Sequence, residues 1–120
     1  MIIWNNMDTL AAYQELQNAE HVNLVAAMSG EAGAERVKNY TVPMGEGLDF
    51  NYGARPVDDK ILEILAKLAA EAQLTEKYEA LYNGEVINTG EKRRVLHHLT
   101  RGQLGETVMA DGVDKRAFYV

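Results

Sequence analysis

Three basic side chains recur at steps of four residues in the second half of the sequence: Arg93, His97 and Arg101. Positions four apart share one face of an α-helix, so these residues would form a cationic stripe, with the apolar residues between them on nearly the opposite side. A stripe of this kind favours an anionic neighbour and suggests a place near or behind an anionic substrate. The alternative is a packed helix in which His97 satisfies a buried carbonyl and the arginines pair with acids.

The other candidates for chemistry are isolated. His97 and His98 are adjacent, so on a helix they point about 100° apart and cannot share a metal, and His21 has no second ligand at helical spacing. Asp58-Asp59 are better explained as charges at a helix N-terminus than as an acid–base pair. Ser29, the only serine, has neither a nucleophile elbow nor a glycine-rich phosphate loop beside it. We therefore expect no catalytic residue, no metal site and no cofactor site within residues 1–120.

Composition limits the classes of protein to consider. A chain of 120 residues with 47% hydrophobic content supports one modest domain. Twelve basic against eighteen acidic residues give a net charge of −6, which argues against a nucleic-acid binder. No apolar run approaches the roughly 18 residues needed to span a bilayer. The absence of cysteine excludes disulfides and fits a reducing compartment. We expect a soluble cytoplasmic protein with no nucleic-acid or membrane partner.

Hydrophobic periodicity predicts a mainly α chain. The strongest pattern covers residues 58–73, where Asp58 or Asp59 would cap a helix whose apolar surface exceeds half of its circumference. Gly84 stands where a left-handed residue would end the helix before it, and Gly102 would end the last helix. The predicted helices cover about 6–18, 23–29, 31–38, 58–73, 76–83 and 90–101.

Two regions indicate extended structure. Residues 40–44 and 48–52 are short extended pieces separated by glycines, which is typical of an irregular or hairpin-like connection. Asp111-Gly112 predicts the turn of a short C-terminal β-hairpin over about 107–119. The chain then stops within the apolar run from Ala117 to Val120, whereas folded chains usually finish in polar residues, so we expect a truncation.

The run 84–101, GEVINTGEKRRVLHHLTR, resembles the GEKIN-x-T-E-x-R-A-V-L-H-x-A-L-R signature of the glucose-6-phosphate isomerase family without a gap. Departures from that pattern concern local packing and fall at Val86, Gly90, Arg94, Leu99 and Thr100. A weaker resemblance covers roughly 48–120, and the first forty residues resemble only a variable N-terminal helical region. The positions that agree are Gly84, Glu85, Ile87, Asn88, Glu91, Arg93, Val95, Leu96, His97 and Arg101.

The resemblance implies that the chain is the N-terminal helical segment of a larger α/β sugar-isomerase fold whose two sugar-isomerase domains are missing. It implies, for the intact enzyme, a cytoplasmic homodimer of glycolysis and gluconeogenesis that interconverts glucose 6-phosphate and fructose 6-phosphate. In that reaction a carboxylate moves a proton between C1 and C2 through an enediolate, without metal or cofactor. Sugar phosphate would bind through the missing domains. This segment would be an inactive scaffold with exposed apolar surface, placing Arg93, His97 and Arg101 near or behind the site at best.

Two other functions stay open. A stand-alone helical interaction module would explain the wide apolar face of 58–73 and predicts a well-packed monomer with an ordered C-terminal end. A regulatory module that binds sugar phosphates would use Arg93, His97 and Arg101, and it predicts saturable, salt-sensitive binding by this chain alone.

Overall fold

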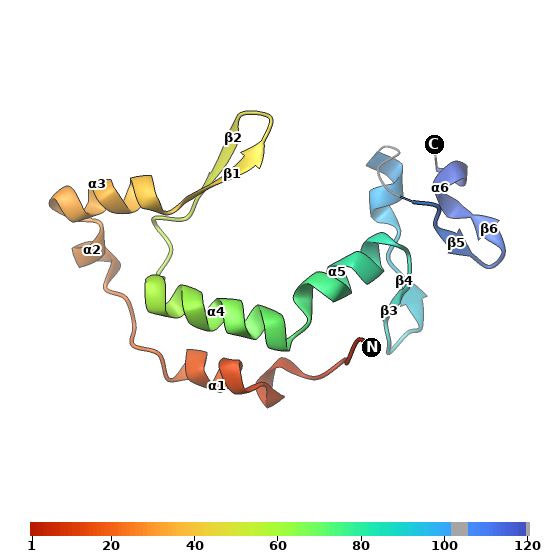
Figure 1. Ribbon diagram of the computed structural model, residues 1–120, viewed down its shortest axis with the longest axis horizontal. Coiled ribbons are helices and arrows are strands. Elements are labelled where there is room, and N and C mark those ends of the chain that lie inside the picture. Colours follow the sequence, from red (N-terminus) through yellow and green to blue (C-terminus); the bar gives the residue numbers. More distant parts are fainter. Residues whose placement is uncertain (102–105, 120) are drawn as a thin grey trace. The chain divides into compact units, whose positions relative to one another are not determined.

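Helix α4 (Asp59–Glu71) is the longest element of the computed structural model, which describes residues 1–101 and 106–119 (Figure 1). Its first turn is capped by Asp58, whose Oδ1 accepts a hydrogen bond from the Ile61 amide at 2.8 Å. Ile61, Ile64 and Leu68 are buried at steps of three and four residues, as an amphipathic helix requires. The helix predicted over 58–73 is therefore present as α4.

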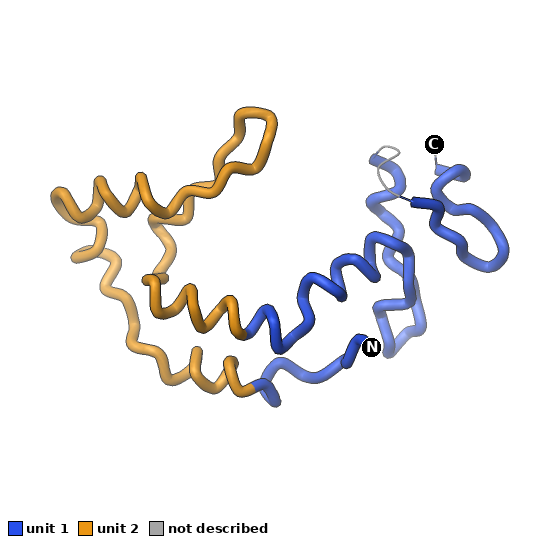
Figure 2. Tube along the Cα trace, viewed as in Figure 1, with its two compact units in different colours: residues 1–10, 68–120 blue, residues 11–67 orange. Residues whose placement is uncertain are grey.

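The chain divides into two compact units (Figure 2). Unit 1 comprises Met1–Leu10 and Leu68–Val120, and unit 2 comprises Ala11–Lys67. Helices hold more of the described residues than strands do, so the chain is mainly α. The sequence analysis expects residues 1–120 to form one N-terminal segment of a larger fold, and this expectation stays a prediction. No helix among the described residues is both long enough and apolar enough to cross a bilayer.

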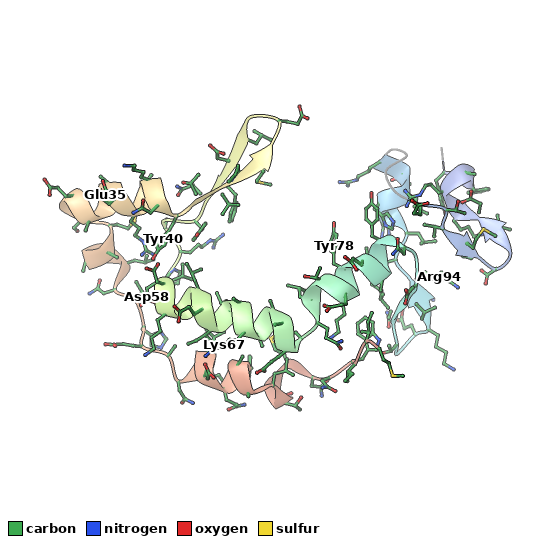
Figure 3. All side chains as sticks on the ribbon, in the orientation of Figure 1. Glu35, Tyr40, Asp58, Lys67, Tyr78 and Arg94 are labelled. Carbon is green, nitrogen blue, oxygen red and sulfur yellow. The ribbon has the colours of Figure 1, made fainter. Side chains whose placement is uncertain are left out.

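Unit 2 packs helix α1 beside the part of α4 that belongs to it. Lys67 Nζ lies 3.0 Å from Glu15 Oε2 across the two helices (Figure 3). Ala12 of α1 is fully buried. The short helix α2 is capped by Asn23, whose Oδ1 accepts from the Ala26 amide at 3.1 Å. The helices that precede α4 in this unit are α1 (Ala11–Gln17), α2 (Leu24–Ala27) and α3 (Gly30–Asn39).

The prediction of one helix over 6–18 is wrong. The 3-10 turn η1 (Met7–Thr9) comes first, and Leu10 then takes extended angles (φ −87°, ψ 139°) before α1 begins. Both the amide and the hydroxyl of Thr9 donate to the Asn6 carbonyl, at 3.1 and 2.7 Å. Hydrogen bonds from a short polar side chain to the nearby backbone compete with those of a continuous helix. The Thr9 hydroxyl makes such a bond here, and the helix does not extend through this turn.

The glycine-punctuated region folds as a β-hairpin of β1 (Thr41–Gly45) and β2 (Leu48–Asn51). Val42 pairs with Phe50, and a bulge lies between Pro43 and Gly45. The connecting residues Glu46 and Gly47 both have positive φ, as the tight two-residue turns of hairpins require. The two extended pieces expected at 40–44 and 48–52 are thus the arms of one hairpin.

One face of this hairpin leaves large apolar side chains in contact with solvent. Val42, Met44 and Phe50 are each about half or more exposed. Together with Tyr52 and Leu62 they line a hollow of about 490 Å³, and these five residues are called the apolar hairpin face below. The exposed apolar surface expected from the sequence is therefore present.

Unit 1 is organised around the end of helix α5. Its buried apolar residues include Ala80 of that helix, together with Leu99, Val108 and Ala110 from later segments. After α4 the elements are α5 (Leu74–Tyr82), β3 (Val86–Asn88), β4 (Arg93–Arg94), η2 (His97–Arg101), β5 (Met109–Ala110), β6 (Val113–Asp114) and α6 (Lys115–Phe118).

Gln73 forms the joint between α4 and α5. Its backbone is left-handed (φ 52°), which interrupts what would otherwise be one helix. Its side-chain amide pairs with the beginning of the chain: Oε1 accepts from the Ile3 amide at 2.7 Å, and Nε2 donates to the Met1 carbonyl at 3.2 Å. One side chain therefore holds both the joint and the first residues of unit 1.

The prediction of a helix over 90–101 is wrong. The segment begins as the return strand of the β3–β4 hairpin, in which Val86 pairs with Arg94, and continues as the 3-10 helix η2. Lys92 has a φ of 55°, which reverses the chain where a helix would have to run straight. Gly102, expected to end this helix, lies outside the described residues.

The C-terminal hairpin is shorter than the range 107–119. Asp111 and Gly112 both have positive φ, so the predicted turn is present between β5 and β6. The second arm ends at Asp114, whose carboxylate accepts from the amides of Arg116 and Ala117 and thereby starts helix α6. Val120, the last residue of the apolar run, lies outside the described residues.

Candidate functional site

The signature segment 84–101 starts at the end of helix α5, where Gly84 stops the helix. Gly84 has a φ of 77°, its amide donates to the Leu81 carbonyl at 3.0 Å, and the Glu85 amide donates to the Ala80 carbonyl at 2.9 Å. This pair of bonds is a Schellman motif, which turns the chain sharply out of a helix. The glycine stop predicted from the sequence is confirmed.

Gly84 is also the point of closest packing in unit 1. A Cβ at this position would collide with Cγ1 of Val108, a residue that is 1% exposed, and would press on Leu96. Glycine fits this position for two reasons: it adopts the left-handed backbone without strain, and it has no side chain to collide with Val108. The glycine therefore joins the start of the signature segment to the C-terminal part of unit 1.

The β3–β4 turn is held by Asn88 and Glu91, whose three-residue spacing would also fit a helix cap. Asn88 Oδ1 accepts from the Glu91 amide at 3.1 Å, and Asn88 Nδ2 lies 3.3 Å from Glu91 Oε2. The contact between the two residues is thus made, but it closes a turn and does not cap a helix. Arg94, on the return strand, donates from Nη1 to the Gly84 carbonyl. The hairpin is consequently tied back to the helix stop from which it departs.

His98 packs on the aromatic ring of Tyr82. The two ring centroids are 4.7 Å apart at an interplanar angle of 24°, and His98 Nε2 lies 2.8 Å from the Tyr82 carbonyl oxygen. Because a carbonyl only accepts, the imidazole must carry its hydrogen on Nε2. The buried Arg116 places its guanidinium carbon 5.6 Å from the Tyr82 ring centroid and donates from Nε to the Glu106 carbonyl. Tyr82, His98 and Arg116 thus hold α5, η2 and α6 together, and their role is structural.

The three residues of the predicted stripe do not share a helical face. Arg93, on β4, has Nε 3.7 Å from Glu91 Oε2 in an exposed pair. His97 and Arg101 stand at the two ends of η2, and both are exposed. Within the part of the chain that the structure describes, no hydrogen bond or ion pair links the three. The position of these three residues near or behind a substrate stays a prediction. The shared helical face from which it was inferred is not present.

The structure instead groups His97 with two residues that sequence reasoning missed, Arg94 and Tyr119. With Leu96 and Thr100 they line a cavity of about 310 Å³ in unit 1. Arg94 had been noted only as a departure from the family pattern. Neither 3.6-residue spacing nor sequence proximity could have joined Tyr119 to the group, because only the fold of unit 1 brings it there.

In unit 2 the most connected charged side chain is Arg36 of α3. Its guanidinium donates to the carbonyls of Gly53, Arg55 and Val57, at 2.6, 2.8 and 2.5 Å, and stacks over the Tyr40 ring at 4.5 Å. Three carbonyls on one guanidinium fix the path of the chain between β2 and α4. Arg36 therefore holds the fold of this unit.

Beside Arg36, the Tyr40 hydroxyl donates to Asp59 Oδ1 at 3.0 Å. Partial burial, and next the hydrogen bond to the Asp59 carboxylate, raise the pKa of the Tyr40 phenol above its usual value. Tyr40 and Asp59 also line a hollow of about 470 Å³ with Glu35. Because the phenol stays protonated and the carboxylate is already occupied, this pair is suited to structure more than to proton transfer.

Within residues 1–101 and 106–119, no group of three His, Asp or Glu side chains is placed so that it could hold a metal ion. Carboxylates with described partners cap helices, close a turn, accept from a tyrosine hydroxyl or form a surface pair, as Asp58, Glu91, Asp59 and Glu15 do.

Comparison with known proteins gives a consistent result. The sequence model of the phosphoglucose isomerase family matches residues 51–118, which include α4, α5 and the whole signature segment. A glucose-6-phosphate isomerase of Treponema denticola is 48% identical over 122 residues, covering 98% of this chain and 23% of the relative. Those of Treponema pallidum and Borreliella burgdorferi are 45% and 35% identical and cover 97% and 99% of the chain, each over 22% of the relative.

These matches extend the similarity beyond the signature segment. They include the first forty residues, which by sequence reasoning resembled only a variable region. The chain spans less than a quarter of the length of the curated relatives that it matches.

Proposed function

Because this chain belongs to the phosphoglucose isomerase family, we propose that it is the N-terminal segment of a glucose-6-phosphate isomerase and serves that protein as scaffold. The observation that carries the proposal is the match of nearly the whole chain to a limited part of each relative. The intact protein would interconvert glucose 6-phosphate and fructose 6-phosphate in the cytoplasm, in glycolysis and gluconeogenesis. It would do so as a homodimer, within a larger α/β sugar-isomerase fold.

In this proposal the segment has no catalytic group of its own. Support comes from unit 1, where the described lining of the cavity beside the signature segment includes no carboxylate. Proton transfer between two carbons of a sugar requires a positioned base, so substrate binding and chemistry would come from the remaining sugar-isomerase domains. Arg93, His97 and Arg101 would lie near or behind that site.

A scaffold role is also favoured over a stand-alone interaction module. Such a module would be a well-packed monomer, whereas the apolar hairpin face leaves Met44 66% exposed and Phe50 51% exposed. A segment that belongs to a larger fold would keep apolar surface for the rest of that fold.

The first test is an assay of the purified chain for isomerisation of glucose 6-phosphate. The chain would be produced in a host whose own isomerase gene has been deleted, so that contamination cannot supply activity. We expect no turnover above the blank. Turnover that co-elutes with the chain through two different columns would contradict the scaffold proposal.

The second test is a chimera in which this chain replaces the matching segment of the Treponema denticola relative. We expect the chimera to isomerise glucose 6-phosphate, because the replaced segments are 48% identical. In the chimera, Arg93→Ala, His97→Ala and Arg101→Ala should each lower kcat/KM by less than about tenfold, whereas loss of an acid or base costs about 10²–10⁴. A loss of that larger size in one of these variants would overturn the supporting role.

A further inference from the structure

The cavity beside η2 is of a size that suits a small ligand. Its volume of about 310 Å³ is at the lower end of the roughly 300–1,000 Å³ that is usual for ligand sites. Its lining comes from β4, from η2 and its preceding residue, and from the residue after α6. All of these belong to unit 1, so the cavity is formed within a single compact unit.

The charge of the lining is opposite to that of the chain. The protein carries eighteen acidic and twelve basic residues. No acid is present among the five residues that line the cavity: Arg94, Leu96, His97, Thr100 and Tyr119. Two cavities of unit 2 differ in this respect: Glu35 and Asp59 line one, and Glu15 lines the other. Among the described lining residues no carboxylate accompanies Arg94, so the positive charge of its guanidinium creates a local field that attracts anions.

Each hydrogen-bonding side chain of the lining is able to donate. Arg94 uses Nη1 for the Gly84 carbonyl, and this bond anchors a planar group that has five N–H donors in total. His97 offers an imidazole N–H and Tyr119 a phenolic O–H. Thr100 donates its hydroxyl to the His97 carbonyl at 2.9 Å, so it stabilises η2 and leaves the anion to the other three.

We propose that this cavity binds a phosphate group, held by Arg94, His97 and Tyr119. A guanidinium recognises oxyanions with two parallel N–H donors, and neutral donors beside it add direction. The ligand is inorganic phosphate or a small phosphate monoester, which share this chemistry. The proposal goes beyond the scaffold role, since it needs neither catalysis nor the sugar-isomerase domains of the proposed intact protein.

The test is calorimetric titration of the complete 120-residue chain with inorganic phosphate at low ionic strength. We expect saturable binding of one phosphate per chain that weakens as sodium chloride is added. Glucose 6-phosphate and glucose, titrated separately, distinguish the sources. Tighter binding of the ester than of inorganic phosphate identifies a monoester as the ligand, and equal binding identifies inorganic phosphate, provided that glucose itself does not bind.

Variants separate a built site from general attraction to positive charge. His97→Phe and Tyr119→Phe should each raise the Kd for phosphate by about five- to tenfold, since each removes a donor to a charged group. Arg93→Gln and Arg101→Gln remove charge from outside the lining and should change the Kd by less than about twofold. Arg94→Lys keeps the charge at position 94 while removing the paired donors, and should weaken binding.

Two results would overturn the proposal. One is the absence of saturable phosphate binding up to about 10 mM, well above the micromolar to millimolar range of ordinary ligand affinities. The other is an equal loss of affinity in Arg93→Gln and His97→Phe, because dispersed attraction would then explain the binding. Circular dichroism of each variant ensures that the comparison is made between folded proteins.

Discussion

Val108 occupies the space that a side chain on Gly84 would need. The Cγ1 atom of Val108 lies against the glycine so closely that an added Cβ would collide with it, and the backbone of Gly84 is left-handed (φ 77°). Two separate requirements, one of conformation and one of volume, therefore select glycine at the start of the signature segment. The two can be measured separately because Gly112 has nearly the same φ, 75°, and nothing within 4 Å of its added Cβ.

Gly84→Ala should lower the free energy of unfolding by about 3 kcal/mol, from about 1 kcal/mol of backbone strain and about 2 kcal/mol of overpacking. Gly112→Ala should cost only the strain, about 1 kcal/mol. Urea unfolding followed by circular dichroism gives both values. Adding Val108→Ala to Gly84→Ala should cost less than the sum of the single changes, because the pair is in contact. Equal costs for the two glycine variants would show that the contact with Val108 is not present.

Arg36→Met should lower the free energy of unfolding by about 2–4 kcal/mol. The change keeps an unbranched apolar stem but removes three charge-assisted hydrogen bonds to the carbonyls of Gly53, Arg55 and Val57. Lys38→Met, at an exposed position of the same helix, is the matched control and should change stability by less than about 0.5 kcal/mol. If both variants unfold at the same urea concentration, the three bonds contribute nothing to the folded state.

Tyr40 makes stability depend on pH in alkaline solution. Partial burial and the Asp59 hydrogen bond raise the pKa of this phenol, so the folded state holds its proton more tightly than the unfolded state does. Its contribution is therefore complete below the ordinary tyrosine pKa of about 10 and is lost as pH rises through the higher pKa of the folded state. Between about pH 8 and pH 11 the free energy of unfolding should decline, and the decline should be weaker in Tyr40→Phe. An identical decline in that variant would contradict this origin.

His98 should be the Nε2–H tautomer in the neutral folded protein. The Tyr82 carbonyl can only accept, and it lies 2.8 Å from Nε2. Nitrogen-15 chemical shifts of the two ring atoms report the tautomer directly. His98→Phe, which keeps a flat ring on Tyr82 but loses the donor, should cost about 1 kcal/mol. His21→Phe, at an exposed position, serves as the control and should cost much less.

Sequence reasoning succeeded where short-range chemistry decides the structure. The Asp58 cap, the Gly84 helix stop and the Asp111-Gly112 turn depend on neighbouring residues alone, and all three are present. It failed over 90–101 because the Asn88–Glu91 contact fits both a helix cap and a tight turn. The pairing of Val86 with Arg94 decides between them, and it depends on where two segments meet in space.

The candidate site was predicted in part for the same reason. His97 was identified from its basic neighbours, but its partners in the cavity are Arg94 and Tyr119. Arg94 was hidden because it lies off the four-residue stripe, and Tyr119 because it lies more than twenty residues away in sequence. Composition and periodicity describe faces of single elements, whereas a cavity is formed by several.

Gln73 ties the first residues of the chain to the α4–α5 joint through a single hydrolysable amide group. Its amide nitrogen donates to the Met1 carbonyl while its oxygen accepts from the Ile3 amide, so both ends of one amide group are used. Deamidation to glutamate would keep the acceptor but replace the donor by a second, negatively charged oxygen facing a carbonyl. Gln73→Glu, which produces the deamidated side chain directly, should therefore loosen the first residues, and faster amide hydrogen exchange over residues 1–10 would record the change.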